Sequence, residues 1–360
     1  MARVIHMDRI RAKVSAGERL GRVEALHILQ NGDLLTLGEM ASRTRFHLHP
    51  EKIVTYVVDR NINYTNICMS ACHFCAFFKP PGDPDGYVLS KEALEQKIRE
   101  TLDLGGTQIL LQGGMNPDLG LDYYMDLLRF IKERFGIHVH GFSPPEVVHL
   151  SKVSSLSIEE VLRRLIEAGL DSIPGGGAEI LVDEVRSRVS PRKCTADQWL
   201  KVMEIAHSLG LRTTATMMFG HLETPTQRIE HMMRIRELQD RTGGFTAFIP
   251  WSFQPDNTAI DVTPVTAVEY LKTLAVSRLV LDNVSNIQAS WVTQGAKIAQ
   301  VSLFFGANDL GSTMIEENVV AAAGVSFRLS EDELVRLARD AGFTPAKRNT
   351  FYKILEKKCA

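Results

Sequence analysis

The sequence has little of several features that would assign it to a common protein class. Its 360 residues carry a formal net charge of -2, and no apolar run approaches the roughly 20 residues of a membrane span. The small net charge gives no electrostatic reason to expect nucleic acid or an anionic membrane as a partner. The N-terminal stretch "MARVIHMDRIRAKVSAG" carries charges throughout, so it does not resemble a secretory signal. We therefore expect a cytoplasmic enzyme with a small-molecule substrate.

Cysteine is also scarce, with only five residues in the chain. In a cytoplasmic protein thiols stay reduced, so grouped cysteines favour a metal site over a disulfide. Two of the five, Cys194 and Cys359, stand alone in the sequence and are expected to be ordinary thiols. The other three lie together and are considered below.

What the sequence does contain, from residue 53 onward, is an alternation of β-rich runs with longer segments whose apolar residues recur every three to four positions. In "SKEALEQKIRETLDLG", Ser90 is a plausible helix N-cap and Gly105 a plausible helix end. Helices over 157–169 and 195–210 follow the same pattern. The expected strands are 53–62, 107–112, 138–143, 170–174, 212–220, 245–253, 286–290 and 301–307.

This alternation predicts an α/β fold with a parallel sheet buried on both faces. Eight units predict closure into a (β/α)8 TIM-type barrel, and the alternative is a six-stranded partial barrel with a separate C-terminal piece. Residues 1–50 are expected to form an N-terminal helical extension, 51–325 the barrel core, and 326–360 a C-terminal helix and tail packed on the barrel.

Polar and glycine-rich clusters directly follow the expected strands. Active sites of such barrels lie at the C-terminal ends of the strands, so these clusters are expected to meet at one mouth. They are "NYTNICMSACHFC", "QGGMNPD", "SPPE", "PGGGAE", "GHLE" and "PWSFQPDN".

The first cluster holds Cys68, Cys72 and Cys75, spaced C-x3-C-x2-C with no fourth cysteine nearby. A disulfide framework needs an even number, and tetrahedral zinc needs a fourth ligand, for which His73 lies within the loop. An iron–sulfur cube has four iron corners, so three thiolates leave one iron open to another molecule. Structural zinc and an electron-transfer cluster with an outside ligand stay open as alternatives.

With Phe74 before the last cysteine, the pattern C-x3-C-x-Φ-C resembles the signature loop of the radical S-adenosylmethionine (SAM) enzymes. The resemblance implies a [4Fe-4S] cluster held by Cys68, Cys72 and Cys75, with SAM on the fourth iron and Phe74 beside the cofactors. It also implies an external one-electron reductant, such as flavodoxin or ferredoxin, and cleavage of SAM to a 5'-deoxyadenosyl radical. The protein would supply orientation and shielding.

Further positions match motifs of the same family. Gly113 and Gly114 resemble the glycine pair that meets the SAM amino group. Gly220 and Glu223, in "MMFGHLE", resemble the fifth-strand motif near the adenine, and Glu179 resembles the acidic residue that contacts the SAM ribose. The resemblance therefore implies that these five residues bind SAM.

Each of these motifs has an ordinary structural alternative. A glycine pair after a strand is commonly a tight turn, and an acidic residue there commonly caps a helix or lies in its first turn. Met115 also stands where many members of the family have an acidic residue. What favours the cofactor role is the order of the motifs behind the cysteine triad.

Longer strings such as "AGLDSIPGGGAEILVDEVR" and "GGFTAFIPWSFQPDNT" resemble the menaquinone-biosynthesis (futalosine pathway) branch of the superfamily, over residues 20–355. The resemblance implies an oxidoreductase that closes a ring in dehypoxanthinyl futalosine: the deoxyadenosyl radical removes the ribose C4' hydrogen, and the carbon radical adds to the benzoate ring. Aminofutalosine synthase and deazaflavin (FO) synthase share these motifs and are alternatives. A non-catalytic iron–sulfur electron carrier is an alternative of another class.

Such a reaction needs donors for the benzoate carboxylate, a base and apolar walls. Gln288, Ser290 and Thr293 are candidate donors, and His221 and Glu146 are candidate bases. Aromatic residues at or near strand ends are candidates for the walls. They are Phe77, Phe78, Phe142, Phe248, Trp251 and Phe253.

Overall fold

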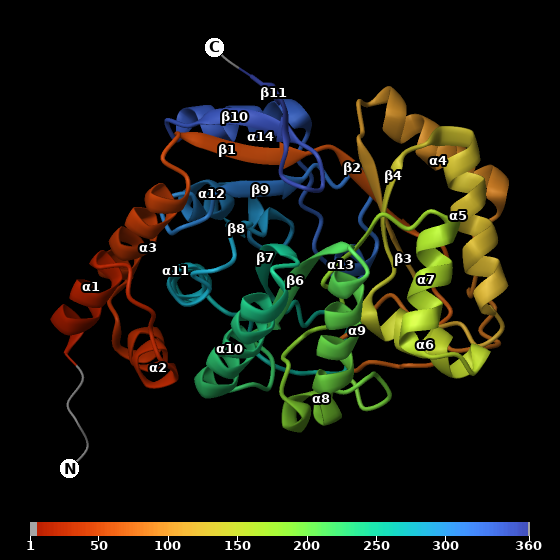
Figure 1. Cartoon of the computed structure of the whole chain (residues 1–360), viewed down its shortest axis with the longest axis horizontal. Helices are drawn as coiled ribbons and strands as arrows, with labels where there is room; N and C mark the ends of the chain where they lie inside the picture. The colour runs from red at the N-terminus through yellow and green to blue at the C-terminus, as the bar shows by residue number, and fades with distance from the viewer. Residues whose placement is uncertain (1–5, 359–360) are drawn as a thin grey trace.

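A seven-stranded parallel sheet, in the order β2-β3-β4-β5-β6-β7-β8, forms the centre of the computed structural model, which describes residues 6–358 (Figure 1). Each strand pairs in parallel with the next, as expected for strands joined by helical crossovers. The strands are β2 (Asp59–Asn63), β3 (Gln108–Gln112), β4 (His138–Gly141), β5 (Ser172–Ile173), β6 (Arg212–Phe219), β7 (Phe245–Ser252) and β8 (Asn286–Ile287).

A second sheet, in the order β11-β10-β1-β9, completes the barrel. A parallel bridge between Gln288 and Asp309 joins the end of β8 to β9, and β9 pairs with β1, which leads directly into β2. The expected α/β barrel is therefore confirmed, with the eighth strand position filled by β9. The strands of this sheet are β1 (Ile53–Val57), β9 (Asp309–Ser312), β10 (Thr344–Arg348) and β11 (Ile354–Lys357).

Three expected elements differ from the structure. The strand expected at 301–307 is wrong, because this apolar run contains the end of α12 and a series of turns, and the strand begins at Asp309. The strand expected at 53–62 is divided at Val58, since β1 pairs with β10 while β2 pairs with β3. The C-terminal segment forms the expected helix but adds β10 and β11, so it extends a sheet as well as packing on the barrel.

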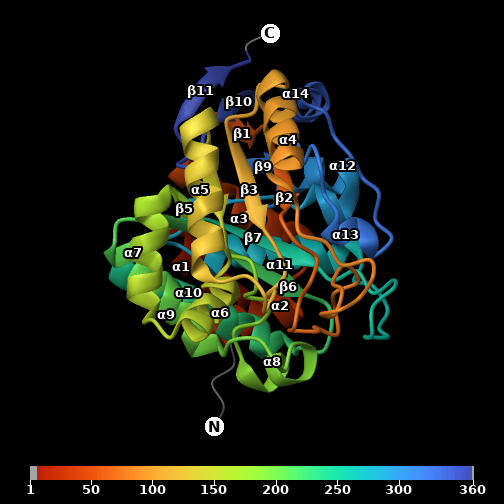
Figure 2. The same ribbon diagram turned by 90° about the vertical axis from the view of Figure 1, so that its right-hand side faces the viewer.

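Helices cover the outside of the sheet (Figures 1 and 2). Their caps follow the sequence: the Ser90 side chain accepts from the N–H of Ala93 at 3.2 Å, as expected for an N-cap. The helices are α1 (Met7–Ser15), α2 (Arg22–Asn31), α3 (Leu34–Leu48), α4 (Lys91–Asp103), α5 (Leu121–Phe135), α6 (Pro144–Ser154), α7 (Ile158–Ala168), α8 (Asp183–Val189), α9 (Ala196–Ser208), α10 (Pro225–Thr242), α11 (Ala267–Val280), α12 (Trp291–Ser302), α13 (Val319–Ala322) and α14 (Glu331–Asp340).

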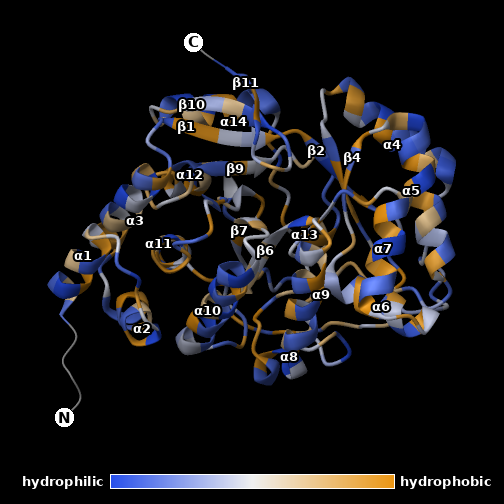
Figure 3. Cartoon of the chain, in the orientation of Figure 1, coloured by the Kyte–Doolittle hydropathy of each residue, from blue (hydrophilic) through white to orange (hydrophobic). Residues whose placement is uncertain are grey.

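The N-terminal helices pack against the barrel helices rather than across its mouth. Helix α3 contacts α11, and α2 contacts α10 and α11. In Figure 3 the outer helices alternate between hydrophobic and hydrophilic residues along their length, as expected when one face lies on the sheet. None of the helices in the described part of the chain combines the length and apolar content that a membrane crossing requires.

Candidate active site

The cysteine loop leaves the C-terminal end of β2 and is held by backbone hydrogen bonds. The N–H of Cys68 donates to the carbonyl of Lys79 at 2.9 Å, and the N–H of His73 donates to the carbonyl of Val189 at 2.9 Å. Cys72 is buried, while Cys68 and Cys75 are half-buried. The loop is therefore tied both to the segment that follows it and to the end of α8 before any ligand is considered.

The position of His73 does not favour the zinc alternative. The imidazole Nδ1 of His73 lies 2.8 Å from the carbonyl oxygen of Arg188, and the side chain is exposed. Within residues 6–358 no three His, Cys, Asp or Glu side chains are placed to hold a single metal ion. Cys359, expected to be an ordinary thiol, lies outside the described residues.

The three thiols fit an iron–sulfur cluster by the chemistry of their surroundings. The backbone N–H of Met115 donates to Cys68 Sγ at 3.4 Å, and burial raises the pKa of Cys75 while hydrogen bonds from the N–H groups of Phe77 and Phe78 oppose that rise. Burial raises the pKa of Cys72 to about 12. Backbone N–H groups directed at cysteine sulfur are a recurring feature of iron–sulfur sites, where they adjust the potential of the cluster.

The glycine turn after β3 lies directly against this loop. A Cβ on Gly114 would be 2.1 Å from the carbonyl oxygen of Ile67 and 2.9 Å from Cys68 Cβ. A Cβ on Gly113 would be 2.5 Å from the ring of Tyr64. Only glycine allows this approach, so the structure brings Gly113 and Gly114 to the cysteines as the sequence suggests.

Hydrogen bonds to the buried Glu146 hold this turn in place. Its Oε1 accepts from the hydroxyl of Tyr64 at 2.7 Å and from the N–H of Gly113 at 3.1 Å, while Oε2 accepts from the N–H of Ser143 at 2.7 Å. Burial raises the pKa of Glu146 against these hydrogen bonds. With both oxygens engaged, Glu146 holds three strand ends together, and it does not line the cavity described below.

Glu179 lies close to the same loop, in a left-handed conformation with φ of 41°. Its Oε1 pairs with Nζ of the half-buried Lys193 at 2.6 Å, and Nζ lies 4.9 Å from the centre of the Phe74 ring. Burial lowers the pKa of Lys193, but Cys72 and Glu179 outweigh burial and raise it. The structure thus brings Phe74 and Glu179 together through Lys193, a residue that no sequence motif singles out.

Gly220 and Glu223 form a separate turn after β6. The carboxylate of Glu223 accepts from the N–H of Gly220 at 2.6 Å and of His221 at 3.0 Å, and it pairs with Arg228 at 2.7 Å. Gly220 has φ of 89°, a conformation that favours glycine. His221 is hydrogen-bonded to the carbonyl of Met218 and does not line the cavity, so neither candidate base reaches it.

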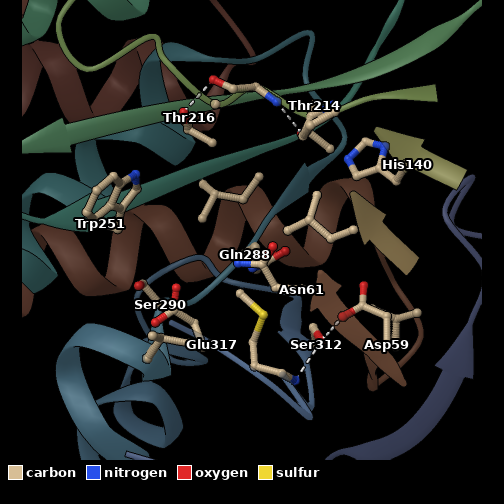
Figure 4. Close-up of a pocket in the computed structure, with 18 of the residues that line it drawn as sticks. Asp59, Asn61, His140, Thr214, Thr216, Trp251, Gln288, Ser290, Ser312 and Glu317 are labelled. Atoms are coloured by element: carbon tan, nitrogen blue, oxygen red, sulfur yellow. Dashed lines mark hydrogen bonds between the residues drawn. The ribbon is translucent and has the colours of Figure 1, made fainter. Parts of the chain in front are cut away.

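A cavity of about 290 Å³ occupies the inside of the barrel (Figure 4). It reaches the strand ends at Gln112, beside the glycine turn, and at the glycines 175–177. The expected residues Gln288, Ser290, Thr293 and Trp251 line it. The other candidate wall residues do not, and three of them are buried in the core: Phe142, Phe248 and Phe253.

The ionisable groups of the cavity are mostly engaged. Arg348 donates from Nε and Nη2 to the two oxygens of Asp309 at 2.6 and 2.9 Å. Asp59 accepts from Gln108 at 2.7 Å, and burial raises the pKa of Asp59. His140 lies 2.7 Å from the hydroxyl of Ser172, and burial lowers its pKa to about 3.

Sequence reasoning missed the polar lining of this cavity because it considered only strand ends. In β2, Asp59, Asn61 and Asn63 occupy alternate positions, and alternate residues of a strand share one face. Asp59 and Asn61 line the cavity. This alternation of polar residues in a buried strand is the signal that could have predicted the lining.

Comparison with known proteins agrees with this geometry. Residues 62–235 match the radical SAM superfamily, and residues 242–359 match the CofH/MqnC C-terminal region. The chain is 50% identical over 351 residues to the cyclic dehypoxanthine futalosine synthase of Halalkalibacterium halodurans, covering 97% of this chain and 95% of that protein.

Two other proteins mark the range of similarity. The chain is 46% identical over 309 residues to the 5-amino-6-(D-ribitylamino)uracil–L-tyrosine 4-hydroxyphenyl transferase of Methanopyrus kandleri, covering 83% of this chain and 84% of that one. The crystal structure of the hydrogenase maturase HydG from Carboxydothermus hydrogenoformans shares the fold, with a TM-score of 0.74 at 18% identity over 96% of this chain and 80% of that chain. The motifs, the fold and these matches agree: the chain belongs to the radical SAM superfamily, in the group that carries the CofH/MqnC C-terminal region.

Proposed function

We propose that this chain is a radical SAM oxidoreductase that converts dehypoxanthinyl futalosine to its cyclic product in menaquinone biosynthesis. One observation carries the proposal. Over 97% of its length, the chain is 50% identical to the cyclic dehypoxanthine futalosine synthase of Halalkalibacterium halodurans. The structure supports it with a cysteine loop at a barrel mouth and a cavity that begins beside the glycine turn.

In this proposal Cys68, Cys72 and Cys75 hold a [4Fe-4S] cluster. The cluster with bound SAM supplies, when present, the one-electron cleavage that yields a 5'-deoxyadenosyl radical. Gly113 and Gly114 let the turn lie directly against Tyr64, Ile67 and Cys68, and we propose that SAM meets the backbone of this turn.

The remaining proposed SAM contacts form two further groups. Phe74 and Glu179 both contact the ammonium group of Lys193, which links them. Gly220 and Glu223 shape the turn after β6, where Glu223 acts mainly by accepting backbone N–H groups. We propose that Gly220 approaches the adenine through its backbone.

The cavity is proposed to hold the substrate. Its volume of about 290 Å³ is at the small end of the about 300–1,000 Å³ found for ligand pockets. Trp251 and Ile249 supply apolar surface, and we propose that the bound substrate and the barrel wall together limit the access of water to a reactive carbon centre. Because the cysteine loop lies at the C-terminal ends of the strands, an external reductant such as flavodoxin or ferredoxin is proposed to approach the barrel at that end.

The test is anaerobic reconstitution with iron and sulfide, followed by incubation with SAM, dithionite and dehypoxanthinyl futalosine. We expect equal amounts of 5'-deoxyadenosine and cyclic product by mass spectrometry. If the substrate is left unchanged, the proposal is wrong.

The second candidate is the transfer reaction of the archaeal relative, favoured by 46% identity over 309 residues. Incubating the same preparation with tyrosine and 5-amino-6-(D-ribitylamino)uracil separates the two candidates, since each predicts a different product. In a third incubation, with SAM and an enolpyruvyl benzoate, incorporation of adenosine into a product would instead indicate the aminofutalosine synthase reaction.

A further inference from the structure

Three side-chain amides line the cavity without a partner among residues 6–358: those of Asn61, Gln112 and Gln288. Asn61 is the most enclosed. The residue is 5% exposed, and its Oδ1 is buried with no hydrogen bond. Figure 4 shows Asn61 and Gln288 in the centre of the cavity.

An unsatisfied buried acceptor destabilises a folded protein by about 1–3 kcal/mol. Such groups are few in natural structures, and one that belongs to a residue lining a cavity is explained when a ligand completes the hydrogen bonds of that side chain. The backbone of Asn61 is already engaged, because its N–H donates to the carbonyl of Glu316 at 3.3 Å. The strand is thus satisfied by the protein, and only the side chain lacks a partner.

The chemistry of the missing partner follows from the amide group, which carries an acceptor oxygen and an NH2 donor. A hydroxyl is both donor and acceptor, so it can bond the Asn61 amide on one side and a neighbouring amide such as that of Gln288 on the other. A carboxylate can only accept hydrogen bonds, and its negative charge would need a free cation.

The charges of the cavity agree with an uncharged ligand group. Arg348 is the only Lys or Arg among the lining residues, and Asp309 engages it at both oxygens. Asp59 and Glu317 are acidic, and Glu317 accepts from the N–H groups of three residues that follow it. With no free cation among these described residues, neutral donors and acceptors must do the recognition.

We propose that Asn61, assisted by Gln288, binds a ring hydroxyl of the substrate's ribose and so positions the sugar inside the barrel. This assignment rests on the proposed function. The apolar lining residues Leu110, Ile249, Trp251 and Met314 are then available to the aromatic part of the substrate.

The experiment compares wild type, Asn61→Leu and Asn61→Asp, each as reconstituted holoenzyme, with dehypoxanthinyl futalosine and with analogues that each lack one ring hydroxyl. Wild type is expected to discriminate against one analogue by about tenfold or more in kcat/KM, because a hydrogen-bonding site rejects a ligand that leaves it unpaired. In Asn61→Leu this discrimination is expected to fall close to one for that analogue alone. Asn61→Asp keeps an acceptor in a side chain of the same size and is expected to keep more of this discrimination than Asn61→Leu.

A stability measurement separates binding from a structural role. Since the amide has no protein partner, Asn61→Leu is expected to leave the Tm of the substrate-free holoenzyme unchanged or raised. The exposed Asn31→Leu serves as a matched control for both readouts.

If wild type turns over the substrate and Asn61→Leu discriminates against the analogue as strongly as wild type does, the assignment of Asn61 is wrong. The proposed function is then unaffected. A lowered Tm with no change in discrimination overturns the assignment as well, because Asn61 would then stabilise the fold without contacting the sugar. If wild type does not turn over the substrate at all, the proposed function and this assignment fall together.

Discussion

The backbone N–H of Met115 donates to Sγ of Cys68 across 3.4 Å, which joins the glycine turn after β3 to the cysteine loop after β2. The Met115 side chain is also buried beneath the loop, with its sulfur 3.9 Å from the hydroxyl of Ser70. The residue that replaces an acidic side chain of the family pattern therefore supports the loop through its backbone and its packing. The loop and the turn form one unit.

Replacing Gly114 by alanine should disrupt this unit. The added Cβ would lie 2.1 Å from the carbonyl oxygen of Ile67, so the loop must move. Displacements of about 1 Å at a reacting centre cost roughly 100-fold in rate, and we expect a loss of that order in 5'-deoxyadenosine release. Gly120→Ala is the control, because nothing lies within 4 Å of its Cβ. Similar rates for the two variants would contradict the close contact.

Cys72→Ala should abolish SAM cleavage under dithionite, together with the visible absorbance of the cluster. The reason is that two thiolates cannot hold three irons of a cube. Cys194→Ala is the matched control, since Cys194 is also buried but contacts Arg186 at 3.8 Å instead of the loop cysteines. Turnover by the Cys72 variant would show that the cluster assignment is wrong.

Lys193→Met should lower the free energy of unfolding by about 3–5 kcal/mol, because it leaves the buried carboxylate of Glu179 without its partner. Urea unfolding followed by circular dichroism measures this. Lys201→Met removes an exposed ion pair with Glu204 and should cost less than about 1 kcal/mol. Equal effects would mean that Glu179 finds another partner.

Stability should fall in mild acid because buried histidines are held neutral. Burial lowers the pKa of His140 and His231 to about 3 and that of His207 to about 4. The unfolded chain, with a histidine pKa of about 6.5, binds more protons below that pH. The contribution of these histidines to the free energy of unfolding is therefore complete above about pH 6.5. As the pH falls from there toward the pKa of the folded state, each histidine lowers the free energy of unfolding by up to about 1.4 kcal/mol per pH unit.

The test replaces one of these histidines. His207→Gln removes one titrating group, so the loss of unfolding free energy between about pH 6.5 and pH 4, as measured by urea unfolding, should become shallower than in wild type. If the free energy of unfolding depends on pH as steeply as in wild type, the pKa of His207 does not differ between the folded and unfolded states.

The sequence predicted the parts of the molecule that follow local rules. The cysteine loop, the Gly113 turn and the cap at Ser90 each depend on residues a few positions apart, and each lies where expected. The barrel followed from repetition of one pattern, since right-handed βαβ units close in few ways.

The remainder depends on contacts between distant residues. The run at 301–307 is apolar, but a short apolar run fits a helix end as well as a strand, and only pairing with β1 selects Asp309 as the start of β9. Lys193 meets Glu179 and Phe74 only because the chain folds back across the mouth. No spacing in the sequence carries that information.

The pairing of β1 with β10 also has a consequence for how the protein is made. Ile53 pairs with Thr344, and Arg348 and Tyr352 line the cavity, although every strand of the seven-stranded sheet precedes them in the chain. A ribosome-bound chain that has completed those seven strands still lacks part of the wall of the cavity. Since pairings between such distant segments form slowly, we expect cofactor loading to follow release of the finished chain rather than to accompany its synthesis.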